Sequence, residues 1–284
     1  MAASSFFRRF QFFWPVSMSS SCASDRIDLH WHETEPGSGI RYALVQLHNP
    51  ERLNAMSVSM WRQLKQVFTD IQQQPDVRCV VVAGAGGNFC AGGDISEYAR
   101  FRFEIDSLRS FHEDDVWGGL GAMLACDVPM IAHIDGVCMG AGLEIASCCD
   151  IRVASASSQF GAPIAKLGFP MAPRELQLVG QAVGDAVARQ ILLEAAVLRS
   201  DDMLRTGFLS EVVADSTALQ ARVQQKTARI LALAPQAARM NKQTLRALAQ
   251  GHLAQSLETA YDYANSAEHR EGIEAFVQKR KPSF

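Results

Sequence analysis

The feature that most constrains the fold is a unit that occurs twice along the chain: an apolar strand, a glycine-rich loop and then a helix. In the first unit, the β-branched run Val77–Ala83 leads into the loop Gly84–Gly93. In the second, Met130–Ile134 leads into the loop Gly136–Gly142, and Leu143–Cys149 has a helical pattern. Short strands that are apolar throughout are typical of parallel sheets covered on both faces, and parallel strands need crossover connections. The repeat therefore predicts the α/β fold class.

The pattern changes along the chain. Ile27–Trp31 and Tyr42–Leu47 alternate as strands do, and Ser57–Gln73 has the periodicity of an amphipathic helix. Beyond residue 200, four segments have helical patterns: Asp215–Leu233, Gln236–Gln250, Leu253–Asn265 and Glu268–Lys281. No low-complexity linker separates the two parts. We therefore expect a core over residues 25–200 and a helical subdomain over residues 201–284 that docks on it.

Residues 1–24 form a leader of different composition. They contain Arg8 and Arg9, many serines and aromatic residues, and no acid. This composition is typical of a transit peptide, which would place the mature protein in the mitochondrial matrix. The alternative is that Met18 is the true initiator, in which case we expect a bacterial, cytoplasmic protein.

Composition excludes several classes of protein. An apolar fraction of 48% and a net charge of -3 exclude a disordered chain. A sequence pI near 6.2 gives no sign of a nucleic-acid-binding face, and no apolar run approaches the ~20 residues that span a bilayer. The seven cysteines are odd in number and form no C-x-x-C pair. They indicate buried thiols in a reducing compartment rather than disulfides or a zinc site.

Glycine-rich loops of this kind have two interpretations. Small residues let a backbone approach a ligand and expose N–H groups, and two such groups aimed at one point form an oxyanion hole. The alternative is tight packing of strand–helix turns. Neither loop has the glycine spacing of a dinucleotide-binding fingerprint or the Lys-Ser/Thr ending of a phosphate loop.

Five segments, in order along the chain, resemble the signatures of one family. They are Asn49–Ala55, Phe89–Ile95, Pro129–Ala154, Phe160–Gly168 and Glu271–Phe284. Their sequences and spacing are similar to those of the crotonase (enoyl-CoA hydratase/isomerase) family. The resemblance implies a spiral core of ββα units and C-terminal helices that assemble trimers, often doubled to hexamers. It also implies an acyl-CoA thioester as substrate and no metal or redox cofactor. Composition, rather than the resemblance, argues against a nucleic-acid or membrane partner.

The resemblance also assigns roles to residues of this chain. The oxyanion donors fall on the backbone N–H groups of Gly93 and Ala141, where alanine replaces the more usual glycine. The remaining candidates would bind coenzyme A: Ala91, Gly92, Asp94 and Ile95 along the adenine, Gly140 in the second loop, and Arg52 at the pyrophosphate. Lys279 and Lys281 would contact the phosphates of coenzyme A bound to a neighbouring subunit, or they form a solvated basic tail.

The carboxylates bear on the reaction. Glu144 matches the family's first catalytic glutamate, and its apolar surroundings predict a raised pKa. The second glutamate is replaced by Ile164, which cannot transfer a proton. Glu175, with Arg174 beside it, is a candidate substitute or a helix-capping residue. His112 lies in the segment that usually lines the acyl pocket, together with Asp114 and Asp115.

Three functions remain open at this stage. The first is an acyl-CoA enzyme that stabilises a thioester enolate, with Glu144 as the single evident acid/base, and that catalyses double-bond isomerisation or hydration. The second is an acyl-CoA decarboxylase of the same fold. The third is a catalytically weak acyl-CoA-binding subunit, which the loss of the second glutamate at Ile164 suggests.

Overall fold

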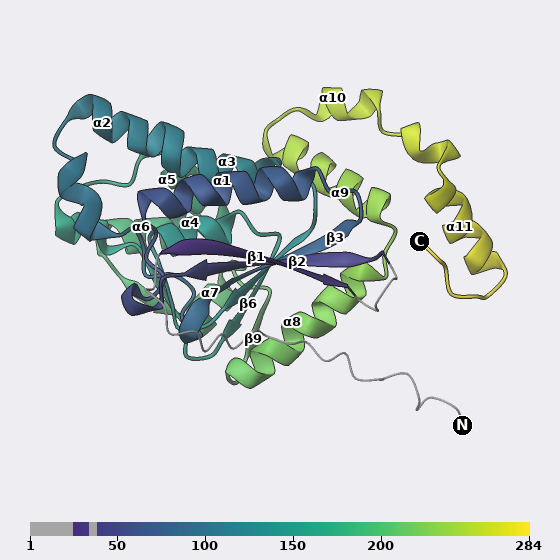
Figure 1. Ribbon diagram of the computed structural model, residues 1–284, viewed down its shortest axis with the longest axis horizontal. Coiled ribbons are helices and arrows are strands. Elements are labelled where there is room, and N and C mark those ends of the chain that lie inside the picture. Colours follow the sequence, from purple (N-terminus) through teal and green to yellow (C-terminus); the bar gives the residue numbers. More distant parts are fainter. Residues whose placement is uncertain (1–24, 34–38) are drawn as a thin grey trace.

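A six-stranded sheet lies at the centre of the molecule, as described by residues 25–33 and 39–284 of a computed structural model (Figure 1). Its strands, in spatial order, are β1 (Arg26–Glu33), β2 (Arg41–His48), β3 (Val77–Gly84), β4 (Met130–Ile134), β6 (Ile151–Ser155) and β9 (Glu211–Val213). β1 and β2 are antiparallel, and every other neighbouring pair is parallel. The predicted α/β fold with a parallel sheet is confirmed.

A second, smaller sheet lies beside the first and carries the second glycine-rich loop. It consists of β5 (Val137–Met139), β7 (Gln159–Gly161) and β8 (Val197–Arg199). Short helices connect the strands on either side of both sheets. These are η1 (Pro50–Arg52), η2 (Ala85–Gly87), η3 (Ile95–Arg100), α2 (Ile105–Ser110), the π-helical η4 (Phe111–Val116), α3 (Trp117–Ala125), α4 (Ala141–Ser147), η5 (Pro163–Leu167), α5 (Pro173–Val183), α6 (Asp185–Leu193) and α7 (Ser200–Arg205).

Strand β3 shows why its sequence is apolar throughout. Val80 and Val82 pack into one hydrophobic cluster, together with Phe68 of helix α1 (Val58–Gln72). Val81 packs into a second cluster on the opposite face, together with Val223 of helix α8 (Ser216–Leu231). Successive side chains of a strand point to opposite faces, so β3 needs apolar residues at every position.

Helix α1 begins and is buried as its sequence predicts. The Ser57 side chain caps it by accepting a hydrogen bond from the backbone N–H of Met60 at 3.2 Å. On its apolar face, Leu64, Phe68 and Ile71 are fully buried, and Val67 is partly buried. This burial places α1 against one face of the sheet, opposite α8 (Figure 1).

The part of the chain beyond residue 200 contributes to the central sheet as well as to the helices. Strand β9 extends the sheet at β6, and α8 covers one sheet face. The remaining helices are α9 (Pro235–Ala249), α10 (Leu253–Glu258), η6 (Asp262–Asn265) and α11 (Ala267–Val277). The predicted helix over Leu253–Asn265 is wrong in one respect, because the chain forms two short pieces there. The proposed boundary near residue 200 stays a prediction.

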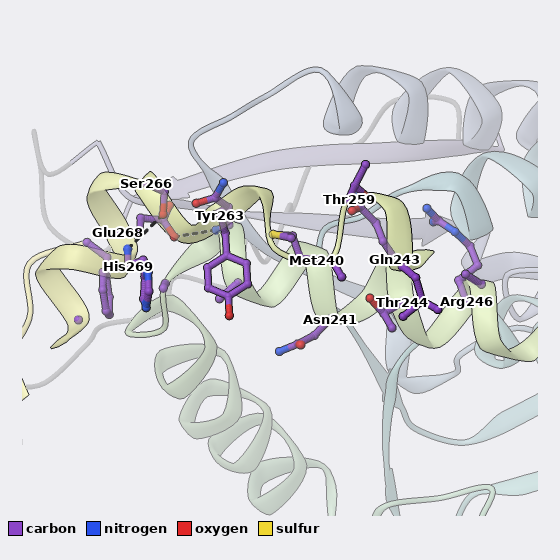
Figure 2. A pocket seen from close by; sticks show the side chains of 18 of the residues that line it. Met240, Asn241, Gln243, Thr244, Arg246, Thr259, Tyr263, Ser266, Glu268 and His269 are labelled. Carbon is purple, nitrogen blue, oxygen red and sulfur yellow. Dashed lines mark hydrogen bonds between the residues drawn. The ribbon is translucent and has the colours of Figure 1, made fainter. Parts of the chain in front are cut away.

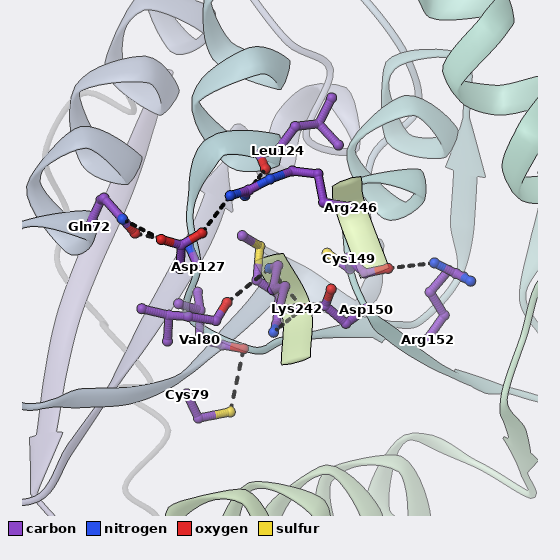
Figure 3. A network of polar contacts seen from close by, with 12 residues as sticks. Gln72, Cys79, Val80, Leu124, Asp127, Cys149, Asp150, Arg152, Lys242 and Arg246 are labelled. Atoms are coloured by element: carbon purple, nitrogen blue, oxygen red, sulfur yellow. Dashed lines mark hydrogen bonds and ion pairs between the residues drawn. The ribbon is translucent and has the colours of Figure 1, made fainter. Parts of the chain in front are cut away.

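Helix α9 docks on the core through polar contacts and buries none of its residues (Figure 3). Lys242 forms an ion pair with Asp150 at 2.8 Å and donates to the Val128 carbonyl at 2.9 Å. Arg246 forms an ion pair with Asp127 at 2.7 Å and donates to the Leu124 carbonyl at 2.8 Å. The orientation of α9 is thus fixed by charge-assisted hydrogen bonds rather than by an apolar face.

Six cysteines lie within the described residues, and all six are buried free thiols. Cys22 and the rest of the predicted leader lie outside the described residues. No helix among the described residues has the length and apolar character to cross a bilayer.

Candidate active site

Hydrogen bonds join the two glycine-rich loops along one edge. The backbone N–H of Cys90 donates to the Val137 carbonyl at 2.9 Å, and the N–H of Met139 donates to the Cys90 carbonyl, also at 2.9 Å. Loops that are far apart in the sequence therefore present their backbones to the same space.

Two glycines allow this close approach. Gly140 has φ +46°, a left-handed value that glycine adopts without a steric penalty. At Gly142, a Cβ atom would lie 2.5 Å from the Cys90 carbonyl oxygen, well inside van der Waals contact. At Gly142, glycine is thus required by tight packing between the two loops. Other backbone N–H groups of the same loops remain free to bind a ligand.

The backbone N–H groups of Gly93 and Ala141 are the amides left open. The Met56 N–H donates to the Gly92 carbonyl, and the Asp94 N–H donates to the Met56 carbonyl, both at 2.8 Å. These two bonds flank Gly93 and form an isolated β-bridge with Met56, so the N–H of Gly93 itself faces away from Met56. Ala141 is the first residue of α4, where no preceding turn supplies an acceptor. Within residues 25–33 and 39–284, neither amide donates to a protein acceptor.

Both residues line a cavity of about 230 Å³ beneath the two loops. The cavity also receives Glu144 from α4 and Glu175 from α5. Aromatic side chains form much of the remaining wall: Trp61, Tyr98, Phe111 and Phe169. Backbone donors, two carboxyl groups and an apolar wall thus converge on one space, which is the arrangement expected of a site for a small ligand.

Glu144 is placed for proton transfer. It is 9% exposed and lies in the first turn of α4. Burial, with the negative charge of Glu175 as a second cause, raises the pKa of Glu144 to about 8. A carboxyl group with a pKa near neutrality can both accept and donate a proton under physiological conditions.

Glu175 supplies a second carboxyl group to the same cavity. It is 3% exposed, and its Oε1 lies 2.8 Å from Nδ1 of His112. His112 belongs to the π-helical η4, and such single π turns often occur at functional sites. The sequence contained both residues as candidates, but their pairing across 63 positions could not be read from it.

Of the other candidates near Glu175, only Ile164 lines the cavity, and Arg174, Asp114 and Asp115 do not. Ile164 lines the cavity and leaves an apolar surface where the family's second glutamate would stand. Arg174 instead pairs with Glu113 at 3.1 Å on the surface. Asp114 accepts a hydrogen bond from Ser110, and Asp115 pairs with Arg62 at 2.7 Å, so that neither aspartate lines the cavity.

The candidate coenzyme A residues are only partly gathered around the cavity. Ala91, Gly92 and Ile95 line it, as does Gly140. Asp94 does not line it, because its carboxylate caps η3 through the Ser96 N–H and pairs with Arg52. Arg52 therefore lies at the edge of the first loop.

Lys279 and Lys281 lie outside the cavity, near the C-terminus. The C-terminal region has a larger cavity of its own, of about 790 Å³, between α9, η6 and α11 (Figure 2). Its polar groups are engaged locally: Glu268 accepts from the Gln236 N–H at 2.9 Å, and Nδ1 of His269 lies 3.1 Å from the Ala264 carbonyl. Among the described residues, the wall of the larger cavity holds no group of buried titratable side chains.

Sequence reasoning missed a charged group in the wall of the smaller cavity. The guanidinium of Arg102 lies over the Phe169 ring at 3.7 Å and over the Tyr98 ring at 4.2 Å. One signal was present in the sequence, because Tyr98 and Arg102 are four residues apart. Phe169 comes from a distant segment, and no local pattern predicts its position.

Comparison with known proteins gives a consistent result. The family model for enoyl-CoA hydratase/isomerase matches residues 38–284. A short-chain-enoyl-CoA hydratase of Clostridium acetobutylicum is 29% identical over 251 residues, which cover 85% of this chain and 93% of the relative. The crystal structure of an enoyl-CoA hydratase/carnithine racemase from Magnetospirillum magneticum superposes with a TM-score of 0.82 and 35% identity, covering 86% of this chain and 91% of that chain. AtuE of Pseudomonas aeruginosa superposes with a TM-score of 0.80 and 31% identity, covering 89% and 98%.

Proposed function

Because the chain belongs to the enoyl-CoA hydratase/isomerase family, we propose that it adds water across the double bond of a short enoyl-CoA thioester, with Glu144 and Glu175 as its acid–base pair. The observation that carries this proposal is the entry of both buried carboxyl groups into one cavity from different helices. The cavity volume of about 230 Å³ supports a short acyl group, since pockets for larger ligands measure ~300–1,000 Å³. The name of the Clostridium relative, a short-chain enzyme, agrees with this size.

In the proposed complex, the thioester carbonyl oxygen accepts hydrogen bonds from the amides of Gly93 and Ala141. These donors stabilise the enolate oxygen where negative charge develops. Coenzyme A itself lies along the loop of Ala91 and Gly92, and Arg52 at the edge of this loop is the proposed pyrophosphate contact. No metal or redox cofactor enters this chemistry.

Hydration needs one group that takes a proton from water and one that gives a proton to the α-carbon. With a pKa of about 8, Glu144 holds a proton at neutral pH. Glu175, held by His112 at 2.8 Å, takes the proton from water as the oxygen adds to the β-carbon. Glu144 then delivers its proton to the α-carbon. Glu175 thus replaces the glutamate that is missing at Ile164.

A single shuttling base suffices for double-bond isomerisation, so a second buried carboxyl group favours hydration over isomerisation. The test compares Glu144→Gln and Glu175→Gln with the wild type in two assays, hydration of crotonyl-CoA and isomerisation of 3-hexenoyl-CoA. We expect each variant to lose hydration by ~10²–10⁴-fold, the usual contribution of a positioned acid or base. Glu113→Gln, which removes an exposed carboxylate from the same region, is the matched control.

The outcomes separate the alternatives. Wild-type hydration by Glu175→Gln would refute the pair, and isomerisation without hydration by the wild type would favour the single-base reaction. Release of carbon dioxide from a malonyl-type thioester, again without hydration, would identify a decarboxylase. Absence of turnover on all of these substrates would favour an acyl-CoA-binding subunit.

The C-terminal helices are proposed to assemble a trimer, which would double to a hexamer. This proposal is supported by large apolar side chains that are exposed on α9 and α11: Leu245, Leu248, Ile273, Phe276 and Val277. Patches of this kind mark interfaces in soluble proteins. In such an assembly, Lys279 and Lys281 reach the coenzyme A phosphates of a neighbouring subunit. Sedimentation equilibrium of the full chain tests the assembly, and a monomer would refute it.

A further inference from the structure

Arg102 places a cation in the wall of the active-site cavity. Its guanidinium is stacked on the rings of Phe169 and Tyr98, at 3.7 and 4.2 Å from their centroids. Both aromatic residues line the same cavity as Arg102. The stacking fixes the plane of the guanidinium, and a fixed plane is what bidentate recognition of a carboxylate requires.

The hydrogen-bonding capacity of Arg102 is incompletely used. Its Nε atom is buried and has no hydrogen-bond partner. Within the part of the chain that the structure describes, Arg102 makes no ion pair with a carboxylate. A buried donor without a partner is costly, and such a group in a native protein calls for an explanation. The Arg102 side chain as a whole lines the cavity, so its guanidinium charge is available to an anionic ligand there.

The position of Arg102 relates it to the acyl group rather than to coenzyme A. A Cβ atom on Gly93 would lie 2.2 Å from the Tyr98 hydroxyl oxygen, so the Tyr98–Arg102 pair adjoins the amide that is proposed to hold the thioester oxygen.

We propose that the acyl group of the substrate carries a carboxylate, which binds the guanidinium of Arg102. The substrate class is then the coenzyme A thioesters of short dicarboxylic acids. Glu175 already lies in this cavity, and its carboxylate would repel a further anion. An anionic acyl group is therefore favourable only where a cation meets it, and Arg102 is that cation.

A purely structural role for Arg102 makes a different prediction. If its only role were to hold Phe169 against Tyr98, its removal would weaken the binding of every acyl-CoA to a similar degree. If it recognises a carboxylate, its removal weakens carboxylate-bearing thioesters selectively. The ratio of affinities for matched thioesters therefore distinguishes the two roles.

The inference rests on the proposed acyl-CoA function, so its test uses saturated thioesters, which the proposed hydratase cannot hydrate. Three pairs differ only by a terminal carboxylate in place of a methyl group: succinyl-CoA with butanoyl-CoA, glutaryl-CoA with pentanoyl-CoA, and adipyl-CoA with hexanoyl-CoA. Isothermal titration of the full-length protein gives the six dissociation constants. We expect the carboxylate to tighten binding by ~10- to 100-fold in at least one pair, as for a charge-assisted hydrogen bond in a buried site.

The variants complete the test. Arg102→Met should bring the affinity ratio of the carboxylate-bearing thioester to its methyl counterpart close to one. Arg102→Lys should retain part of this ratio, because lysine keeps the positive charge but lacks the planar, bidentate geometry of the guanidinium. Arg100→Met is the matched control, since Arg100 is 77% exposed and pairs with Glu97, and it should keep the wild-type ratio. Circular dichroism confirms that each variant is folded.

Two results would overturn the inference. One is a wild-type protein that binds the two members of every pair equally well. The other is an Arg102→Met or Arg102→Lys variant whose affinity falls by the same factor for both thioesters of a pair. Failure of the proposed hydration would appear separately, as tight and selective binding without turnover of any enoyl-CoA.

Discussion

Glu144 and Asp127 are buried to nearly the same extent, 9% and 8% exposed, yet their pKa values move in opposite directions. Burial, together with the charge of Glu175, raises the pKa of Glu144 to about 8. Burial also acts to raise the pKa of Asp127, but hydrogen bonds from Gln243, Gln72 and Arg246 outweigh it and lower that pKa. Burial alone therefore does not decide in which direction the pKa of a carboxyl group moves.

The difference lies in the partners. Asp127 accepts hydrogen bonds from Gln72 of α1 and from Gln243 and Arg246 of α9, at 2.7 to 2.9 Å, and so joins α9 to the core. Figure 3 shows Asp127 between Gln72 and Arg246. Glu144 faces a cavity and a second carboxyl group. A carboxylate whose lone pairs are satisfied stabilises the fold, whereas one that lacks donors keeps a proton that it can transfer.

The largest effect is expected when Glu144 is given a positively charged partner, so that its surroundings resemble those of Asp127. In Ile164→Lys, an ammonium group enters the cavity wall, lowers the pKa of Glu144 and removes its proton at neutral pH. We expect kcat for crotonyl-CoA hydration to fall by ~100-fold or more, in the range of general acid–base effects. Ile164→Met, which keeps an apolar side chain of similar size, is the control and should lose far less. Equal kcat values for the two variants would contradict the role given to the unpaired state of Glu144.

The converse change removes the partnered carboxylate. Asp127→Ala leaves Arg246 and two glutamines without their acceptor, and we expect the free energy of unfolding to fall by about 3 kcal/mol. Urea denaturation measures this change. Asp106→Ala is the control, because Asp106 is highly exposed and its removal should leave the stability unchanged within error. A small effect of Asp127→Ala would show that α9 is held by other contacts.

The pH dependence of stability sharpens the comparison further. The folded state binds more protons at Glu144 than the unfolded state between pH 4.5 and about 8, so this residue lowers stability as pH rises through that window. Glu144→Gln removes the effect, and we expect the variant to gain about 1–3 kcal/mol over the wild type from pH 5 to pH 9. Asp127 has the opposite sign: its lowered pKa contributes stability above its unfolded pKa that is lost in acid.

Urea denaturation of the wild type and Glu144→Gln across this pH range tests both statements. A difference between the two proteins that does not change with pH would contradict the raised pKa of Glu144. Preserved stability of both proteins in acid would likewise contradict the lowered pKa of Asp127.

The smallest effect is expected from two exposed lysines near the C-terminus. Lys279 and Lys281 lie on the surface, where solvent and salt screen their interactions. We expect the double substitution Lys279→Ala/Lys281→Ala to raise KM for an acyl-CoA substrate by less than tenfold, with kcat nearly unchanged. The increase should shrink in high salt. An unchanged KM at low salt would indicate that the two lysines do not meet the phosphates.

Much of this fold follows from local patterns. The β-branched run of β3 and the apolar face of α1 each predicted an element, because burial imposes the spacing of their side chains. The family resemblance placed Gly93, Ala141 and Glu144 in one site, and all three line one cavity.

The pairing of His112 with Glu175 was not predictable in the same way. It depends on how a π-helical turn and helix α5 meet across the cavity, and such packing leaves no periodic signal. Docking of the C-terminal helices on the core was predicted, but the polar contacts that hold α9 there were not, since its polar residues resemble those of any solvated helix surface. Contacts between distant polar side chains are the part that the sequence does not disclose.

The polar attachment of α9 has a consequence for how the molecule opens. A helix with no buried residue exposes little apolar surface when it detaches, and its donors and the carbonyls that accept from them can exchange their hydrogen bonds for water. We therefore expect the amide protons of α9 to exchange with solvent before those of β3. Detachment of α9 should leave the cavity that holds Glu144 and Glu175 intact, because no residue of α9 belongs to its wall.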